Sequence, residues 1–367
     1  MSKKKSKTDQ KRKPVHSRLR RRVLVALGYN DQMLHRGIAS FAHRAGWVLD
    51  ISMSRYGTLP GWWRGDGILT LLLPEQTDLA KWIKGRRVPV ASLNADLTPG
   101  IPGVTLAHEM TGRMVARYFI ERGIEHLAFY RCSDVPDVAG RQKGFAEEAA
   151  AAGIPCEVID VRTADRNKSF DWLVDRMAAL PSPVGILSQS DHRAPQLYAA
   201  CEEAKRSIPE EVAIVGVDND ELTCEFAPVP LSSVDTNRRR LGWEAAAMLD
   251  RMMDGQTPPD RPLTVEPIGI VERASSQLLA IRHEGVAAAL EYIWKHFREP
   301  INANNVVAQV TMSRCGLYRA FEKHVGRSIG DELLRLRVEH AKRLLVKTQE
   351  KMIVIATQSG FSSGEHF

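Results

Sequence analysis

The chain divides into two regions by the spacing of its apolar residues. From residue 23, short runs rich in Val, Ile and Leu alternate with longer stretches in which apolar residues recur every three or four positions. The runs predict strands at 23–27, 67–73, 88–93, 126–130, 184–187 and 212–217. The longer stretches predict helices at 33–45, 78–84, 107–122, 138–152 and 194–205.

Strands that are apolar almost throughout, alternating with helices, predict a parallel sheet covered on both faces. The alternation extends over about 250 residues, which is long for one sheet and suits two lobes. We therefore predict an α/β bilobed domain at 23–275, a linker at 276–284 and an all-α domain at 285–367. The stretch Ala274–Gln277 marks the change between the two patterns.

The second region has a helical period. Ala289, Ile293 and Phe297 share one face of a helix that ends before Pro300. A short second helix follows, with apolar residues at Val306, Val307 and Val310. The segment 302–326 then has the pattern of a helix–turn–helix.

The second helix of this unit has clear ends. Ser313 is its predicted N-cap, Gly326 its C-terminal stop, and Leu317 and Phe321 lie on its buried face. Such a helix enters the major groove of DNA and offers its outer side chains to the bases. The outward residues are Arg314, Cys315, Tyr318, Arg319 and Lys323. A plain three-helix bundle with a solvated basic face is the alternative interpretation.

A long helix follows, with Leu334, Val338, Ala341 and Leu345 predicted on its inward face. Residues 355–361 then repeat the spacing of residues 306–312. This weak repeat predicts a second helix–turn–helix unit. Because the chain stops at Phe367, we expect its recognition helix to be incomplete.

Positive charge lies at both ends of the chain. Residues 1–22 have a formal net charge of +10, residues 23–281 of −7, and residues 282–367 of +4. Two basic ends suit DNA, whose phosphates favour Lys and Arg through counterion release. We predict that residues 1–22 form a disordered basic tail, and a solvated tail without a target is the alternative.

Composition bounds the remaining possibilities. No apolar run approaches the roughly 20 residues that span a bilayer, and the run at 23–27 is too short for a signal-peptide core. The five cysteines are scattered and have no metal-type spacing. We therefore expect a cytoplasmic protein with no membrane partner, no metal site and no cofactor.

Polar residues at the strand ends are candidates for ligand binding, because ligands of open α/β sheets bind beyond the carboxyl ends of the strands. Carboxylates, amides and an arginine suit a sugar, since each hydroxyl both donates and accepts a hydrogen bond. The candidates are Arg141, Ser190, Asp191, Asp218 and Asn219, together with the segment 28–31 after the first strand.

Each of these candidates also has a purely structural interpretation. Asp191 can cap the helix that follows it, and residues 218–220 can form a turn. Trp62 and Trp63 can stack on a sugar ring or belong to the core.

Residues from about 285 to 367 resemble the AraC/XylS family of transcription regulators. The similarity is carried by Arg319, Phe321 and Gly326 in the first unit and by Ile355, Ala356 and Phe361 in the second. The resemblance implies two units joined by a long helix, with base-facing residues Cys315, Tyr318, Arg319, Gly364, Glu365 and His366. Family members continue for about two more helical segments, which supports the expectation of an incomplete domain.

Residues 23–275 resemble the LacI/periplasmic-binding-protein sensor fold. The segments 208–219 and 231–234 carry this similarity, and the positions matching ligand contacts are Arg141, Ser190, Asp191 and Asp218. A sensor that precedes an AraC-type domain resembles bacterial regulators of xylose operons. The resemblance implies a homodimeric activator that binds DNA and RNA polymerase and responds to xylose or a related pentose.

Two alternatives to this sugar-responsive regulator stay open. One is an enzyme using the α/β cleft, but the sequence has no phosphate-binding loop, G-x-G-x-x-G motif or nucleophile elbow. The other is a sugar-binding protein that does not bind DNA, against which stand the missing signal peptide and the helix–turn–helix pattern. We therefore expect no enzymatic activity.

Overall fold

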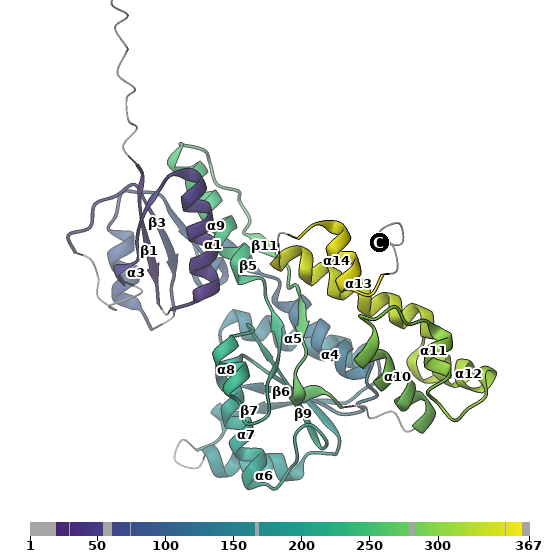
Figure 1. The fold of residues 1–367 in the computed structure, drawn as a ribbon. Helices are drawn as coiled ribbons and strands as arrows, with labels where there is room; N and C mark the ends of the chain where they lie inside the picture. The colour runs from purple at the N-terminus through teal and green to yellow at the C-terminus, as the bar shows by residue number, and fades with distance from the viewer. Residues whose placement is uncertain are drawn as a thin grey trace, which may run out of the picture.

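The computed structural model describes residues 20–28, 30–53, 61–73, 75–165, 169–278, 283–348 and 350–361. Two α/β lobes are joined at a narrow crossing, and a helical domain lies against the second lobe (Figure 1). This arrangement confirms the predicted bilobed α/β domain followed by an all-α domain. Most of the predicted basic tail lies outside the described residues.

The first lobe contains a four-stranded parallel sheet in the order β2-β1-β3-β4. Its strands are β1 (Arg22–Leu27), β2 (Val48–Asp50), β3 (Gly67–Leu71) and β4 (Val90–Ser92). Its helices are α1 (Gln32–Ala45), α3 (Thr77–Lys84) and α9 (Arg238–Met253), with a 3-10 turn at Ala95–Leu97.

Strand β1 explains why the sequence pattern was continuous rather than alternating. Val23, Val25 and Leu27 pack in the core that α1 and α9 cover, whereas Leu24 and Ala26 pack in the core that α3 covers. Both faces of the strand are therefore buried from Val23 to Leu27, and each of these five positions is apolar.

The second lobe contains a six-stranded sheet in the order β12-β10-β9-β8-β6-β7, in which β12 alone of the described strands runs antiparallel. Its strands are β6 (Leu127–Arg131), β7 (Cys156–Asp160), β8 (Val184–Ser188), β9 (Val212–Val217), β10 (Ser232–Asp235) and β12 (Gly269–Val271). Its helices are α4 (His108–Ile120), α5 (Pro136–Ala151), α6 (Ser169–Ala179), α7 (Ala194–Glu203) and α8 (Glu221–Phe226). Short 3-10 turns lie at Val161–Thr163, Asp191–Arg193 and Ala274–Ser276.

The chain crosses between the lobes three times, after β5 (Val104–Leu106), after β10 and after β11 (Leu263–Val265). Strands β5 and β11 pair in parallel at this junction. The predictions missed β7, α6, β10 and α9, as well as the short elements β2, β5, α8, β11 and β12. The apolar pattern of α9 is weak because three of its six buried residues, Gly242, Ala245 and Ala246, are small.

The helical domain contains α10 (Glu284–His296), α11 (Ala303–Val307), α12 (Arg314–Val325), α13 (Ile329–Lys347) and α14 (Met352–Gln358). The inward face predicted for α13 is wrong at two positions, since Leu334 and Leu345 are 52% and 44% exposed. Leu333 is buried instead, because it packs with Ile329 in the core around α12 and so fixes the rotation of the helix. None of the helices in the described residues is long and apolar enough to cross a membrane.

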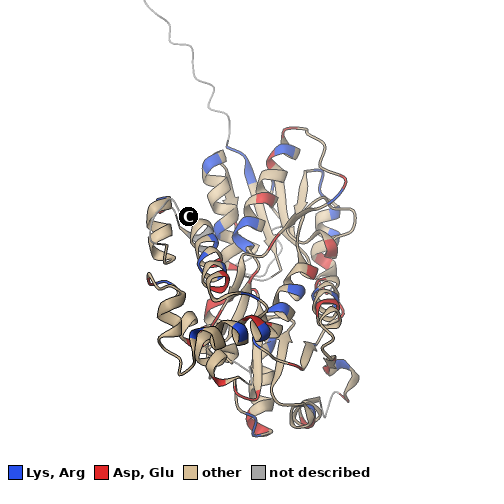
Figure 2. Ribbon diagram, turned by 90° about the vertical axis from the view of Figure 1, so that its right-hand side faces the viewer, with Lys and Arg blue, Asp and Glu red and all other residues tan. Residues whose placement is uncertain are grey.

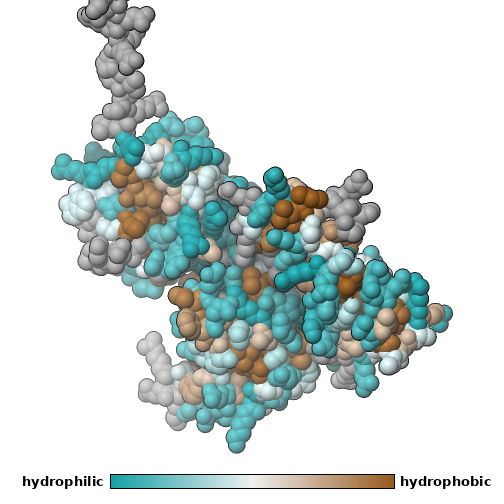
Figure 3. Space-filling view, in the orientation of Figure 1, coloured by the Kyte–Doolittle hydropathy of each residue, from teal (hydrophilic) through white to brown (hydrophobic). Residues whose placement is uncertain are grey.

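Helix α14 exposes apolar side chains on one face and buries apolar side chains on another. An apolar patch covers α14, where Met352 and Ile353 are exposed (Figure 3). Ile355 and Ala356 of the same helix are buried, as the predicted repeat requires of its first helix.

Glycines allow helices to pack closely in both lobes. A Cβ on Gly112 of α4 would overlap the carbonyl oxygen of Arg141 in α5, and one on Gly144 of α5 would overlap that of Glu109. The pair Gly37 and Gly242 has the same role between α1 and α9. Each lobe therefore contains a helix pair in backbone contact, which cannot separate or slide without disrupting its packing.

We predict that Gly112→Ala lowers the apparent thermal unfolding midpoint by about 5 °C, since overpacking a close helix contact costs about 1–3 kcal/mol. Circular dichroism during heating measures this change. The control is Gly85→Ala, where the nearest atom to the added methyl lies 3.5 Å away. A midpoint for Gly112→Ala equal to that of the control would contradict the packing argument.

Candidate functional site

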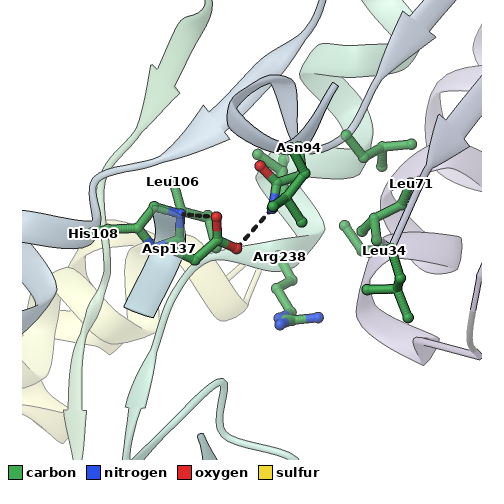
Figure 4. A pocket seen from close by; sticks show the side chains of 11 residues that line it. Leu34, Leu71, Asn94, Leu106, His108, Asp137 and Arg238 are labelled. Atoms are coloured by element: carbon green, nitrogen blue, oxygen red, sulfur yellow. Dashed lines mark hydrogen bonds and ion pairs between the residues drawn. The ribbon is translucent and has the colours of Figure 1, made fainter. Parts of the chain in front are cut away.

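A cavity of about 70 Å³ lies between the two lobes, at the carboxyl ends of their strands (Figure 4). Leucines from the first lobe form one wall, and polar side chains from both lobes and the crossings form the other. The lining residues are Leu34, Leu71, Leu73, Leu93, Asn94, Leu97, Leu106, His108, Asp137, Arg238 and Leu241.

A chain of charged groups joins the lobes beside this cavity. Arg238, the first residue of α9, forms ion pairs with Asp31 of the first lobe and, at 2.7 Å, with Asp218 of the second. Arg141 lies 3.6 Å from Asp218 and donates a hydrogen bond to the carbonyl oxygen of Gln189. Both predicted residues Arg141 and Asp218 are therefore brought together at the junction.

The turn after β9 directs Asp218 toward these arginines. Asp218 and Asn219 have φ angles of 107° and 51°, in a region that residues other than glycine seldom adopt. Burial opposes ionisation of Asp218, but the charges of Arg238 and Arg141 outweigh it and lower its pKa to about 2. Asp218 is therefore ionised at neutral pH and forms ion pairs with both guanidinium groups.

A second polar group within the cavity has unused hydrogen-bonding atoms. Asn94 donates to Asp137 at 2.7 Å, and the His108 ring lies 3.5 Å from the other oxygen of Asp137 (Figure 4). Both ring nitrogens of His108, Oδ1 of Asn94 and Oδ1 of Asp137 are buried without a hydrogen-bond partner among the described residues. Buried polar atoms are rarely left unpaired, so these atoms suit a polar ligand.

His108 is neutral in this site. Burial, followed by the charge of Arg141, lowers the pKa of His108 to about 3. Burial also raises the pKa of Asp137. A neutral imidazole has one donor and one acceptor, which matches the capacity of a hydroxyl group.

The same region has the spacing of a metal site. The ligand atoms of Asp96, His108 and Asp137 lie within 4.8 Å of one another. Asp96 accepts a hydrogen bond from Thr105, however, and Asp137 accepts one from Asn94. Two carboxylates and an imidazole can bind hydroxyl groups as well as a cation, so this spacing alone does not indicate a metal.

Two other predicted residues use their polar atoms inside the second lobe. Asp191 is fully buried and accepts hydrogen bonds from Ser233 Oγ at 2.6 Å and from the backbone of Asp220 at 2.8 Å. Its pKa is raised to about 8, first by burial and then by the charge of Asp218. Asn219 accepts from Arg273 at 3.0 Å. Ser190 is half-buried and precedes the 3-10 turn Asp191–Arg193.

The two tryptophans proposed for stacking on a sugar do not line the cavity. They precede β3 and so lie at its amino end, away from the edge where ligands bind. Trp63 is 2% exposed in the core of the first lobe, whereas Trp62 is 69% exposed. Their interpretation as stacking residues is therefore wrong.

Sequence reasoning missed Asn94, Asp96, His108, Asp137 and Arg238. Three of these could have been found, since Asn94 and Asp96 follow the predicted strand at 88–93 and Arg238 follows the Ser232–Asp235 segment. Asp137 and His108 carried no such signal, because their positions depend on how α4 and α5 begin.

Helix α12 has the orientation expected of a recognition helix. Ser313 caps it by accepting from the Gly316 amide at 3.2 Å, and Gly326 ends it with a φ of 74°. Leu317 and Phe321 are fully buried. The side chains of Arg314, Cys315, Arg319 and Lys323 are exposed and Tyr318 is half-buried, on the outer face as predicted.

The remaining predicted DNA contacts are Gly364, Glu365 and His366, which lie outside the described residues. The predicted linker lies partly outside them too. Its first residue, Ser276, is fully buried and hydrogen-bonded to Ser232 and Tyr118. The start of that segment is thus packed on the second lobe.

We predict that the free energy of unfolding, without sugar, decreases as pH falls from about 6.5 toward 3. The unfolded chain binds a proton on residue 108 in this range, whereas folded His108, with a pKa of about 3, does not. His108→Gln should reduce this decrease, as measured by urea unfolding at neutral and mildly acidic pH. His43→Gln, at an exposed position of α1, is the control. If the free energy of unfolding has the same pH dependence in His108→Gln and wild type, the low pKa assigned to His108 is refuted.

Comparison with known proteins supports the two-domain arrangement. Residues 116–276 match the periplasmic binding protein-like domain, and residues 306–367 match a helix-turn-helix domain. The xylose operon regulatory protein of Escherichia coli (strain K12) is 26% identical over 319 residues, covering 83% of this chain and 80% of that protein. The protein of the same name from Haemophilus influenzae (strain ATCC 51907 / DSM 11121 / KW20 / Rd) is 27% identical over 279 residues, covering 74% and 72%.

A solved structure of the xylose-binding transcription activator xylR has the same fold. Its TM-score is 0.62 at 23% sequence identity, and the match covers 95% of this chain and 94% of that one. Both domains and their order along the chain are therefore shared with these relatives. The chain is a DNA-binding transcription regulator in which a periplasmic-binding-protein-like domain precedes a helix-turn-helix domain.

Proposed function

We propose that this protein is a cytoplasmic regulator that binds xylose or a related pentose between its lobes and operator DNA through its helix-turn-helix domain. One observation carries this proposal. The sensor domain contains a cavity whose buried polar atoms have no hydrogen-bond partner among the described residues. The helical domain that follows it exposes Arg314, Arg319 and Lys323 on α12. The names of the relatives, which are xylose operon regulatory proteins, support the choice of sugar.

The chemistry of the cavity suits a small sugar. The neutral imidazole of His108, the carboxylate of Asp137 and the amide of Asn94 supply hydrogen-bond donors and acceptors. They suit hydroxyl groups, because each hydroxyl both donates and accepts a hydrogen bond. The leucines opposite them suit the apolar face of a sugar ring. A ligand so placed touches both lobes, because Asn94 follows β4 of the first and Asp137 lies in the first turn of α5 of the second.

The proposed sugar stabilises the closed arrangement of the lobes. Asp31, Arg238 and Asp218 already hold opposite charges across the junction, so a bound sugar adds contacts to an organised closure. Binding shifts the population toward the closed arrangement, and the size of the shift is set by the difference in the sugar's affinity for the closed and open arrangements. We infer that the active species is a homodimer, that the closed form favours DNA binding, and that the bound protein activates RNA polymerase.

We predict that Asp137→Asn weakens binding of D-xylose about tenfold or more, because a charged acceptor of sugar hydroxyls is replaced by a neutral amide. Calorimetric titration with a panel of pentoses measures the dissociation constants. Asp134→Asn, in the same loop but with a side chain 70% exposed, is the matched control and should bind like wild type. Absence of binding of any pentose to wild type would refute the proposed effector.

We predict that Arg314→Ala with Arg319→Ala weakens DNA binding. The negative slope of log affinity against log salt should become shallower by about one for each arginine that binds a phosphate in the wild type. Fluorescence anisotropy of a duplex, selected by the wild-type protein from a random pool, measures both quantities. The control is Lys84→Ala with Arg87→Ala, which removes two exposed charges from the first lobe. If both double variants weaken DNA binding equally, the decrease comes from the loss of positive charge in general, and the assignment of α12 as the DNA-binding surface is contradicted.

A further inference from the structure

Helix α4 connects the candidate pocket to the helical domain. Its first residue, His108, lines the cavity, and the residues after its last turn, Glu121 and Arg122, contact the helical domain. With 13 residues, the helix is about 20 Å long. One straight element therefore has one end at the proposed sugar and the other at the DNA-binding domain.

Four charged residues hold the far end of α4. Glu121 pairs with Arg327 at 3.0 Å and with Arg335 at 3.4 Å. The same arginines pair with Glu332 of α13, at 3.3 and 2.7 Å. We call Glu121, Arg327, Glu332 and Arg335 the clamp. Seen from the side of the helical domain, basic and acidic segments lie close together in the middle of the molecule (Figure 2).

The carboxylates of the clamp are shielded from solvent enough to reduce the screening of their ion pairs by water and salt. The Glu332 side chain is 3% exposed and that of Glu121 is 20% exposed. Isolated surface ion pairs contribute little because water and salt screen them, whereas partly buried networks are screened less. Two arginines shared between two carboxylates therefore restrict the orientation of α13 relative to α4.

Arg122 makes a second contact beside the clamp. Its guanidinium lies 3.5 Å from the ring centre of Tyr118 and 4.2 Å from that of Trp294, which belongs to α10. It also pairs with Glu272 at 2.8 Å, and its side chain is 4% exposed. A buried cation between aromatic rings of two domains favours one docking geometry.

The near end of α4 is coupled to the pocket through α5. Gly112 and Gly144 allow the two helices to touch along their backbones, so that they move as one body. Helix α5 carries Asp137 and Arg141, and α4 carries His108. The pocket residues of the second lobe and the interdomain contacts thus share one rigid unit.

We propose that α4 and the clamp transmit effector binding to the helix-turn-helix domain, an inference that rests on the proposed function. The sugar fixes the second lobe relative to the first through His108 and Asp137. The clamp makes the helical domain follow the second lobe, so the position of α12 depends on closure. When the clamp is broken, these charges no longer restrict the orientation of α13 relative to α4, and DNA affinity depends less on sugar.

The test measures two quantities in full-length protein. The first is the dissociation constant of D-xylose, by calorimetry. The second is the ratio of affinities for the selected duplex with and without saturating D-xylose. The variants are Glu121→Gln, Arg335→Gln and their double, and the control is Glu148→Gln. Glu148 pairs with Arg117 of α4 at 2.8 Å but lies within the sensor domain.

We expect the three clamp variants to bind D-xylose as wild type does, while the affinity ratio falls by about 2- to 30-fold. The double variant should show little further decrease beyond either single variant, because both changes break the same network. Glu148→Gln should keep the wild-type ratio. If Glu121→Gln and Arg335→Gln do not fold, Trp294→Leu tests the same docking by removing the partner of Arg122.

Each contrary result has a distinct meaning. A wild-type protein that binds no D-xylose, or whose DNA affinity ignores it, overturns the proposed function and the inference with it. A wild-type response that persists in the clamp variants and in Trp294→Leu overturns the inference alone. An equal decrease of the ratio in Glu148→Gln also overturns it, since the effect then does not belong to the clamp.

Discussion

Opposite charges meet where the two lobes join, and the geometry of the sensor depends on them. Arg238 lies between Asp31 of the first lobe and Asp218 of the second, and Arg141 lies beside Asp218. Charges removed from water must be neutralised by close partners, and an unpaired member would be strongly destabilising. The lobes are therefore held in an arrangement that brings polar atoms from both to one cavity. The left-handed turn at Asp218 is part of the same constraint.

Close helix packing within each lobe confines movement to the junction between the lobes. Glycines bring α1 against α9 in one lobe and α4 against α5 in the other. Rearrangement within a lobe would break these contacts, so changes at the cavity are expressed as motion between lobes. Because α4 also reaches Glu121 and Arg122, that motion extends to the helical domain.

Local sequence signals were most reliable where local chemistry decides the structure. Ser313 and Gly326 define α12 through a cap and a left-handed residue, and both are as predicted. Leu317 and Phe321 then fix which side chains face outward. The phase of α13 was predicted less well, because Ile329 and Leu333 are selected by packing against α12 rather than by the apolar pattern of α13 itself.

The sequence by itself determined the fold class, the order of the domains and the outer face of α12. These follow from short-range properties, namely buried apolar runs, helix caps and the period of apolar residues. The tertiary structure alone decided which polar residues share the cavity and which lie beside it. Arg141 and Asp218 meet at the junction of the lobes beside the cavity, whereas Asp191 and Asn219 bond within the second lobe. His108, Asp137 and Arg238 join the site from three distant segments, because burial and partner choice depend on contacts between residues far apart in the chain.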